Sequence, residues 1–198
     1  MKEKFKNRKG IYIWVILGTF LIFSMIFSYS KLHNSQLDYV YMHASWTYRY
    51  GDISELAKKS DCIARVIVKD DGISKENGLI PNTTFSVEVT NPIFKCENGD
   101  ILKVYMSGGL KDKKIYEISD DPLMKKGEEY IIFTQKNADG TYTVLGGSQG
   151  RMQYKDGKIS SLNIVNKQVK ESSSSLLKLD NISEDTFVDN IKSYLSKP

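Results

Sequence analysis

An uncharged run of nineteen residues, IYIWVILGTFLIFSMIFSY at 11–29, limits the fold of this chain more than any other feature. A helix of about 20 residues spans the hydrocarbon core of a bilayer, and backbone groups in lipid must bond within their own segment. The run therefore predicts a single transmembrane helix over 11–29. A signal peptide cleaved after Ser30 is the alternative, since Ser28 and Ser30 are small, but the run is longer than the apolar region of most signal peptides.

The net charge of +4 comes from residues 1–10, which hold five Lys and Arg against one Glu. The positive-inside rule places this basic tail in the cytoplasm and predicts that everything after the helix is extracellular. Since the rest of the chain is neutral, it lacks the basic excess that nucleic-acid binding needs, and we expect no nucleic-acid partner. The predicted order is a cytoplasmic tail (1–10), the transmembrane helix (11–29), a juxtamembrane stalk (30–51) and an extracytoplasmic domain (52–198).

Short runs of β-branched and apolar residues, separated by turn signals, predict a β-dominated domain with about six strands. Asp139-Gly140 and Asp156-Gly157 are typical hairpin tips. Capped apolar stripes predict helices at 53–59 and 183–195, and the mixed-charge segment 110–128 is predicted to be a loop. Runs that fit strands lie at 62–69, 83–94, 129–135, 141–145, 149–154 and 158–161, and a further one begins at Ile101 and ends at Gly108-Gly109.

Four segments, SDCIARVIVKD, TTFSVEVTNPIFKCENGDILKVYMSGG, PLMKKGEEYIIFTQ and GGSQGRMQYKDGKI, resemble small membrane-anchored or secreted proteins of Gram-positive bacteria. Their barrel is similar to the OB-type barrel of netrin modules and tissue inhibitors of metalloproteinases. The resemblance covers residues 52–195 and implies a small OB-like β-barrel with a C-terminal amphipathic helix. Metalloproteinase inhibition does not carry over, because those inhibitors chelate zinc with an N-terminal Cys, and cleavage after Ser30 would expose Lys31.

Residues 146–150, GGSQG, fit the G-x-S-x-G pattern of serine hydrolases and make Ser148 a candidate nucleophile. The pattern works when a strand, a sharp turn and a helix follow one another, but residues 151–154 read as another strand. A His base is also expected downstream of the Ser, and the chain has none there. We therefore predict that the glycines serve a bend between strands, that Ser148 is not catalytic, and that the protein is not an enzyme.

No metal or cofactor site is predicted. The two histidines, His33 and His43, lie ten residues apart in the stalk and lack metal-ligand spacing. Asp120-Asp121-Pro122 is predicted to be a solvated turn rather than a calcium site, because regularly spaced oxygen ligands are missing. The aromatic residues of the stalk favour packing on the domain or near lipid headgroups over a binding platform.

Cys62 and Cys96 form a candidate disulfide, since both fall in the predicted external domain and at the outer ends of two strands expected to pair. A bridge needs Cα atoms within about 7 Å. Two unpaired thiols are the alternative.

These features predict a membrane-anchored, extracytoplasmic, non-catalytic binding module with a protein or envelope-polymer partner. One alternative is a serine-type hydrolase that uses Ser148. The other is an accessory subunit of a membrane complex, although Gly18 alone is not a GxxxG packing motif.

Overall fold

The structure is a computed structural model that describes residues 18–20, 22–25, 37–43, 48–76, 78–162 and 181–196. The chain divides into two compact units, Met1–Asp38 and Tyr39–Pro198. The second unit contains the β domain, and it includes part of the segment predicted to be a stalk.

The transmembrane helix predicted over 11–29 is wrong for the described part of the chain. Residues 18–20 and 22–25 are helical, but no described helix is long and apolar enough to cross a membrane. A spanning helix requires about 20 consecutive residues. The rest of 11–29, the basic tail 1–10 and Ser30 lie outside the described residues. The fold class is therefore corrected to a mainly β chain with a barrel and a C-terminal helix, and the external location, which rests on the helix, stays a prediction.

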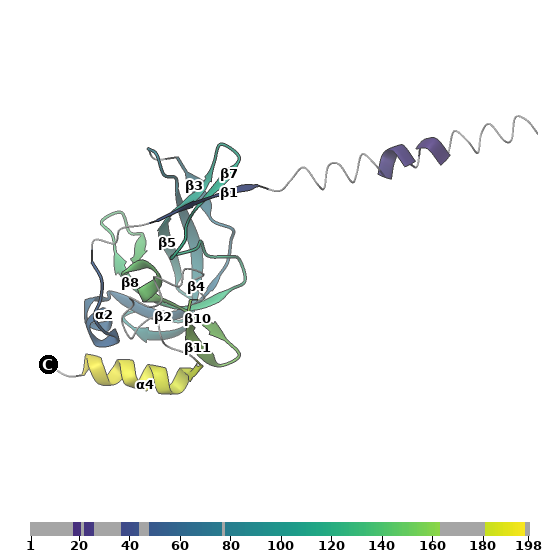
Figure 1. The fold of residues 1–198 in the computed structure, drawn as a ribbon. Coiled ribbons are helices and arrows are strands. Elements are labelled where there is room, and N and C mark those ends of the chain that lie inside the picture. The colour runs from purple at the N-terminus through teal and green to yellow at the C-terminus, as the bar shows by residue number, and fades with distance from the viewer. Residues whose placement is uncertain are drawn as a thin grey trace, which may run out of the picture. The chain divides into compact units, whose positions relative to one another are not determined.

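Five strands close into a barrel, in the order β2, β4, β5, β9, β8 and back to β2 (Figure 1). Every neighbouring pair is antiparallel except β5 and β9, which run parallel with Val104 opposite Tyr142. Closure leaves these strands without the free edges that promote aggregation. Their bounds are β2 (Cys62–Val68), β4 (Asn82–Phe94), β5 (Ile101–Ser107), β8 (Glu129–Lys136) and β9 (Tyr142–Val144).

The long strand β4 bends so that it can serve several partners. Its first part pairs with β5 and with the short strand β3 (Ile73–Lys75), and its second part pairs with β2. The register with β2 shifts between Ile63 and Ala64, where Pro92 is the partner of Ala64. Pro has no N–H for a ladder bond, which fits its place at this irregularity in the strand pairing.

The structure contains more strands than the sequence predicts. Twelve strand segments lie in the described residues, including β6 (Gly109–Lys111) and β7 (Lys114–Ile118) inside the predicted loop 110–128. β7 also pairs with β1 (Asp38–Met42), so that a three-stranded sheet forms in the order β1, β7, β6. Strands of three to five residues with few apolar positions show no readable alternation, which is why 110–128 reads as a loop.

Three more strands extend the sheet beyond β8 in the order β10 (Arg151–Lys155), β11 (Lys158–Ser161) and β12 (Ile182–Ser183). β10 and β11 form the hairpin predicted around Asp156-Gly157, and β8 and β9 form the one around Asp139-Gly140.

Both predicted helices are confirmed as α2 (Ile53–Lys59) and α4 (Glu184–Leu195). Asp52 caps α2 by accepting a 2.9 Å hydrogen bond from the Glu55 amide, and Ser183 caps α4 by accepting one from the Thr186 amide. These bonds satisfy N–H groups that a helix leaves unpaired at its start.

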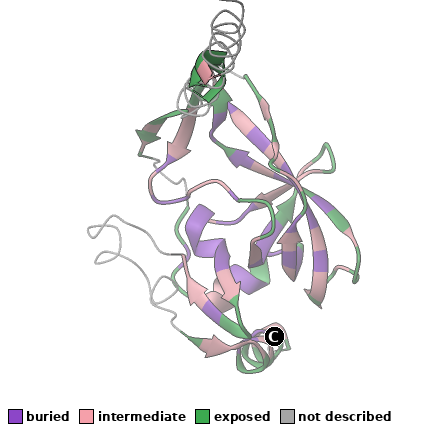
Figure 2. Cartoon of the chain, turned by 90° about the vertical axis from the view of Figure 1, so that its right-hand side faces the viewer, coloured by how far each residue is buried: buried purple, intermediate pink, exposed green. Residues whose placement is uncertain are grey.

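The core has two parts because β8 is covered on both faces. Figure 2 shows the buried segments toward the middle of the domain and exposed ones toward its loops. Tyr130 and Ile132 belong to the barrel interior, whereas Ile131 and Phe133 belong to a second cluster under α2 and α4. Successive side chains of a strand point to opposite faces, so a strand covered on both sides is apolar throughout. This explains the continuous run YIIF within β8.

Candidate functional site

Ser148 lies in a buried turn rather than in a nucleophile elbow. β9 ends at Val144, Gly146 has a left-handed φ of 62°, and residues Gly147–Gly150 form a single 3-10 turn. β10 then starts at Arg151, so the helix that would supply oxyanion-hole amides is replaced by a strand. Only 4% of Ser148 is exposed. The predicted bend between two strands is confirmed.

The neighbouring Gln149 shows what the motif does in the fold. Its Oε1 accepts a 3.0 Å hydrogen bond from the Tyr50 amide, and its Nε2 donates a 3.0 Å bond to the Tyr50 carbonyl. The carboxamide thus pairs with backbone as a β-strand would, and it fixes the segment before α2 to the barrel. Tyr50 itself is buried in the cluster under the helices. This segment packs on the domain, as predicted for part of the stalk.

Gly150→Ala is expected to lower the free energy of unfolding by about 1–3 kcal/mol, the usual range for overpacking. Gly150 does not have a positive φ, but a Cβ built there overlaps the backbone carbonyl of Leu145, which cannot move away as a side chain would. Ser148→Ala is the matched control in the same turn, and we expect it to change stability by less than about 1 kcal/mol. Urea denaturation of the full chain measures both.

Covalent labelling of Ser148 by a fluorophosphonate probe that disappears on heat unfolding would contradict this interpretation. So would a Gly150→Ala variant as stable as the parent chain.

A second serine has partners that resemble a catalytic set. On β4, the Ser86 hydroxyl donates to Oδ2 of Asp70 and accepts a 2.6 Å hydrogen bond from the Lys103 ammonium. Lys103 is exposed and acts as the donor, so it cannot take the serine proton as a general base would. This cluster could not be predicted from the sequence because its members lie in a turn and on two different strands.

The Asp70 carboxylate is stabilised by this arrangement. Burial acts to raise the pKa of Asp70, but the hydrogen bonds from the Ser86 hydroxyl and amide and from the Gly72 amide, together with the Lys103 charge, outweigh it. The pKa of Asp70 therefore lies below its usual value. The cluster ties the turn after β2 to β4 and β5, which is a structural role.

Arg151 is the largest fully buried side chain of the domain, with 0% of its surface exposed. Nη2 donates to Oδ1 of Asp121 at 2.9 Å and to the Pro122 carbonyl. The guanidinium carbon lies 5.0 Å from the ring centre of Tyr130, within range for a cation–π contact. Burial raises the pKa of the Asp121 carboxyl, and the positive charge of Arg151 opposes this rise.

The prediction of a solvated turn at Asp120-Asp121-Pro122 is wrong. Both aspartates are only 6% exposed. The cause is Arg151, thirty positions later in the chain, whose charge needs a partner once β10 carries it into the interior. A local sequence pattern contains no sign of that distant partner.

Cys62 and Cys96 come together at the ends of β2 and β4, and both are free thiols in this structure. Their pairing strands place Ile63 opposite Phe94. The hydrogen bond with Cys96, together with burial, raises the pKa of the Cys62 thiol, and the same bond lowers the pKa of Cys96. The two sulfurs are therefore neighbours, and a bridge between them stays a prediction.

Of the two histidines, His43 is exposed after β1, and His33 lies outside the described residues. Among the residues that the structure describes, no group of three or more His, Cys, Asp or Glu is placed to hold a metal ion. The absence of a metal and of a cofactor stays a prediction.

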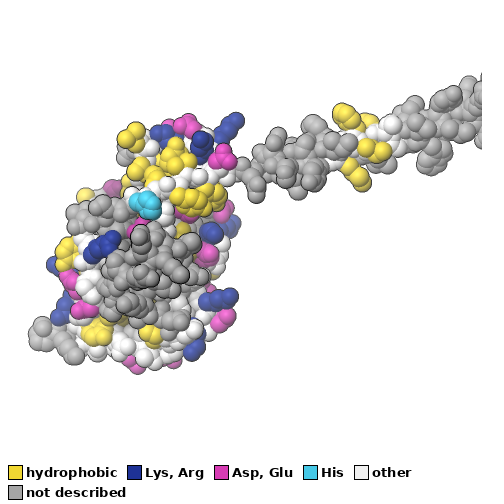
Figure 3. All heavy atoms as spheres, in the orientation of Figure 1, with side chains coloured by type: hydrophobic (Ala, Val, Ile, Leu, Met, Phe, Trp, Pro, Cys, Tyr) yellow, Lys and Arg dark blue, Asp and Glu magenta, His cyan; other side chains and the backbone are white. Residues whose placement is uncertain are grey.

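Exposed apolar side chains gather at one end of the domain, which we call the barrel tip and define as residues 75–76, 78–81 and 109–114. Leu79 is 90% exposed, Ile80 43% and Leu110 46%. Figure 3 shows hydrophobic side chains beside charged ones at the upper end of the domain. This surface was not predicted from the sequence, although the apolar pair Leu79-Ile80 between the turn residues Gly78 and Pro81 could have indicated it.

Hydrogen bonds hold the two segments of the barrel tip side by side. The Lys111 ammonium donates to the Gly78 carbonyl at 2.9 Å, and the Gly108 amide donates to the Pro81 carbonyl at 2.8 Å. The Leu110 amide also donates to the Ser74 hydroxyl at 2.9 Å. The exposed side chains therefore sit on a braced pair of hairpins.

No protein-family model, curated protein or solved structure matches this chain. The resemblance to small bacterial proteins with a netrin-like barrel stays a prediction.

Proposed function

We propose that this chain is a non-catalytic binding module whose partner docks at the barrel tip. The observation that supports this most is the exposure of Leu79, 90%, on a loop that is braced by hydrogen bonds to Gly78 and Pro81. A large aliphatic side chain held in water contributes nothing to folding, and clustered exposed apolar residues mark interaction sites.

The residues that could carry chemistry are engaged within the fold, which supports a non-catalytic role. Ser148 is buried, and the Ser86 proton is directed to Asp70. Arg151 is enclosed with Asp121. The hydrolase alternative is therefore disfavoured, and the accessory-subunit alternative depends on the helix over 11–29 that is corrected above.

The resemblance to OB-type barrels also supports the proposal. OB-type barrels are five-stranded and bind ligands with the face of the second and third strands and with the loops between strands 1 and 2 and between strands 4 and 5. In this chain the first two barrel strands are β2 and β4, and the connection between them carries β3 and part of the barrel tip.

A photo-crosslinking amino acid placed at position 79 of the full chain in living cells tests the proposal. We expect an adduct at 79 and none at 101, where Ile101 is 54% exposed at the far end of β5 and serves as the matched control. An adduct with either protein or lipid supports a binding module. Equal labelling at both positions, or none at 79, contradicts it.

A further inference from the structure

We infer that the partner of the barrel tip is an anionic lipid bilayer, with Leu79 and Ile80 entering the headgroup region and the surrounding lysines facing lipid phosphates. The inference rests on the proposed function, because it names the partner of the same surface. It concerns a peripheral contact made by loops of the β domain.

The first support is the shape of the apolar group. Leu79 and Ile80 are consecutive residues at a turn, 90% and 43% exposed, and Gly78 permits that turn with a φ of 73°. Two adjacent aliphatic side chains on a narrow hairpin can enter a headgroup layer to a depth of about 5–10 Å, as the apolar faces of interfacial helices do. A flat protein partner would leave most of such a projecting pair uncovered.

The second support is the charge around these side chains. The barrel tip contains four lysines and two acidic residues, Glu76 and Asp112. Lysine is depleted in protein–protein interfaces, where aromatic residues and arginine are enriched, whereas it is the usual partner of anionic headgroups. Aliphatic residues with lysines around them therefore favour a lipid partner over a protein partner. The lysines are Lys75, Lys111, Lys113 and Lys114.

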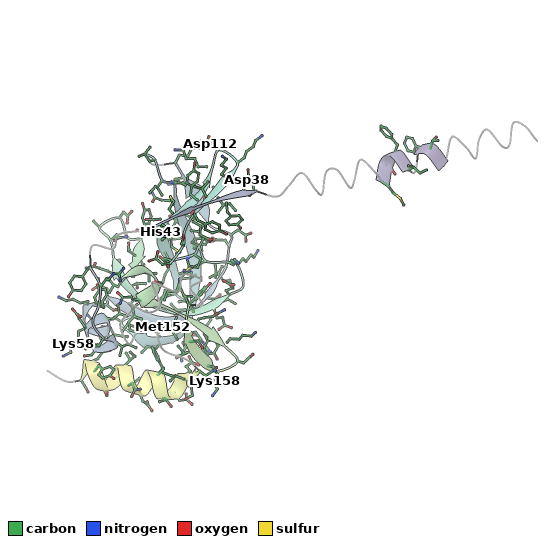
Figure 4. The ribbon with its side chains drawn as sticks, in the orientation of Figure 1. Asp38, His43, Lys58, Asp112, Met152 and Lys158 are labelled. Carbon is green, nitrogen blue, oxygen red and sulfur yellow. The ribbon has the colours of Figure 1, made fainter. Side chains whose placement is uncertain are left out.

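The third support is position. Asp112 marks the barrel tip at one end of the domain in Figure 4, and Lys58 and Lys158 lie at the other end, near α2 and α4. A planar surface can therefore meet the tip without meeting the helices. On β1, which lies in the same sheet as β6, Tyr39 and Tyr41 are exposed and stacked at 5.8 Å, and tyrosine suits the interfacial layer of a membrane.

An environment-sensitive fluorescent amino acid at position 79 of the full chain tests the inference, with the same residue at 101 as control. Vesicles of phosphatidylcholine alone are compared with vesicles that also contain phosphatidylglycerol. We expect a blue shift of emission at 79 with the anionic vesicles, at least threefold smaller with the neutral ones, and no shift at 101. This readout reports the tip itself, whatever other part of the chain contacts lipid.

A charge-reversal pair separates electrostatic docking from simple apolar contact. Lys113→Glu with Lys114→Glu is expected to lower the fraction of protein shifted at 79 at least fivefold. The matched control is Lys155→Glu with Lys158→Glu, which changes two exposed lysines of the hairpin at the opposite end and should leave the shift unchanged.

No shift at 79 with anionic vesicles overturns the inference, and so does an equal shift with neutral ones. If position 79 then crosslinks to a protein in cells, the lipid inference fails and the binding module stands. If it crosslinks to nothing, both fail.

Discussion

Asp121→Ala is expected to lower the free energy of unfolding by about 3–5 kcal/mol, the range measured when one partner of a buried ion pair is removed. The variant leaves the Arg151 guanidinium fully enclosed, without the carboxylate that its Nη2 contacts at 2.9 Å. The guanidinium then keeps only the neutral Pro122 carbonyl and the Tyr130 ring beside it, and neither carries the opposite charge.

Two further variants show whether the ion pair itself is the cause. Replacing both partners, Asp121→Leu with Arg151→Met, should recover most of the loss, since apolar side chains of similar volume often substitute for a buried pair. Asp189→Ala removes an exposed carboxylate from α4 and should change stability by less than about 0.5 kcal/mol. Urea denaturation followed by circular dichroism measures all three. A loss below about 1 kcal/mol for Asp121→Ala would contradict the prediction that the Arg151 charge depends on the Asp121 carboxylate.

Phe187→Ala is expected to cost about 3–5 kcal/mol, as for other large-to-small changes in a core. Phe187 is 2% exposed and meets Phe133 edge to face, with ring centres 6.3 Å apart. It is one of two buried residues of α4, so the cavity would lie between the helix and β8. The same denaturation experiment measures the loss.

Asn190→Ala, on the exposed face of α4, is the control and should stay within about 0.5 kcal/mol of the parent chain. If Phe187→Ala costs no more than this control, α4 does not pack on the barrel as described.

Elements whose signal is local were predictable from the sequence. Asp52 and Ser183 each stand before an apolar stripe at helical spacing, and both caps form as expected. β2 and β8 are runs of β-branched and apolar residues, and they pair as neighbouring strands of the barrel. The hairpin tips follow from Asp-Gly pairs, because these residues tolerate the turn geometry.

Features that depend on distant partners were not predictable. The Asp121 carboxylate is buried because β10 brings Arg151 to it, and Ser86 meets Asp70 and Lys103 only after three segments pair. β6 and β7 form because their backbones pair with each other as antiparallel strands. Their sequence is rich in lysine and does not indicate a strand. The spanning helix over 11–29 was predicted from hydropathy alone, and among the described residues no helix is long and apolar enough to cross a membrane.

The two hydrogen bonds between the Gln149 carboxamide and the Tyr50 backbone are expected to affect the rate at which the domain unfolds. The two residues are 99 positions apart, so their bonds close a loop that contains all five strands of the barrel. Contacts of such separation form late, because the chain entropy of closure is lost before they contribute. Interactions absent from the folding transition state slow unfolding and leave the folding rate unchanged. The carboxamide of Gln149 is therefore expected to slow unfolding of the domain and to leave its folding rate nearly unchanged.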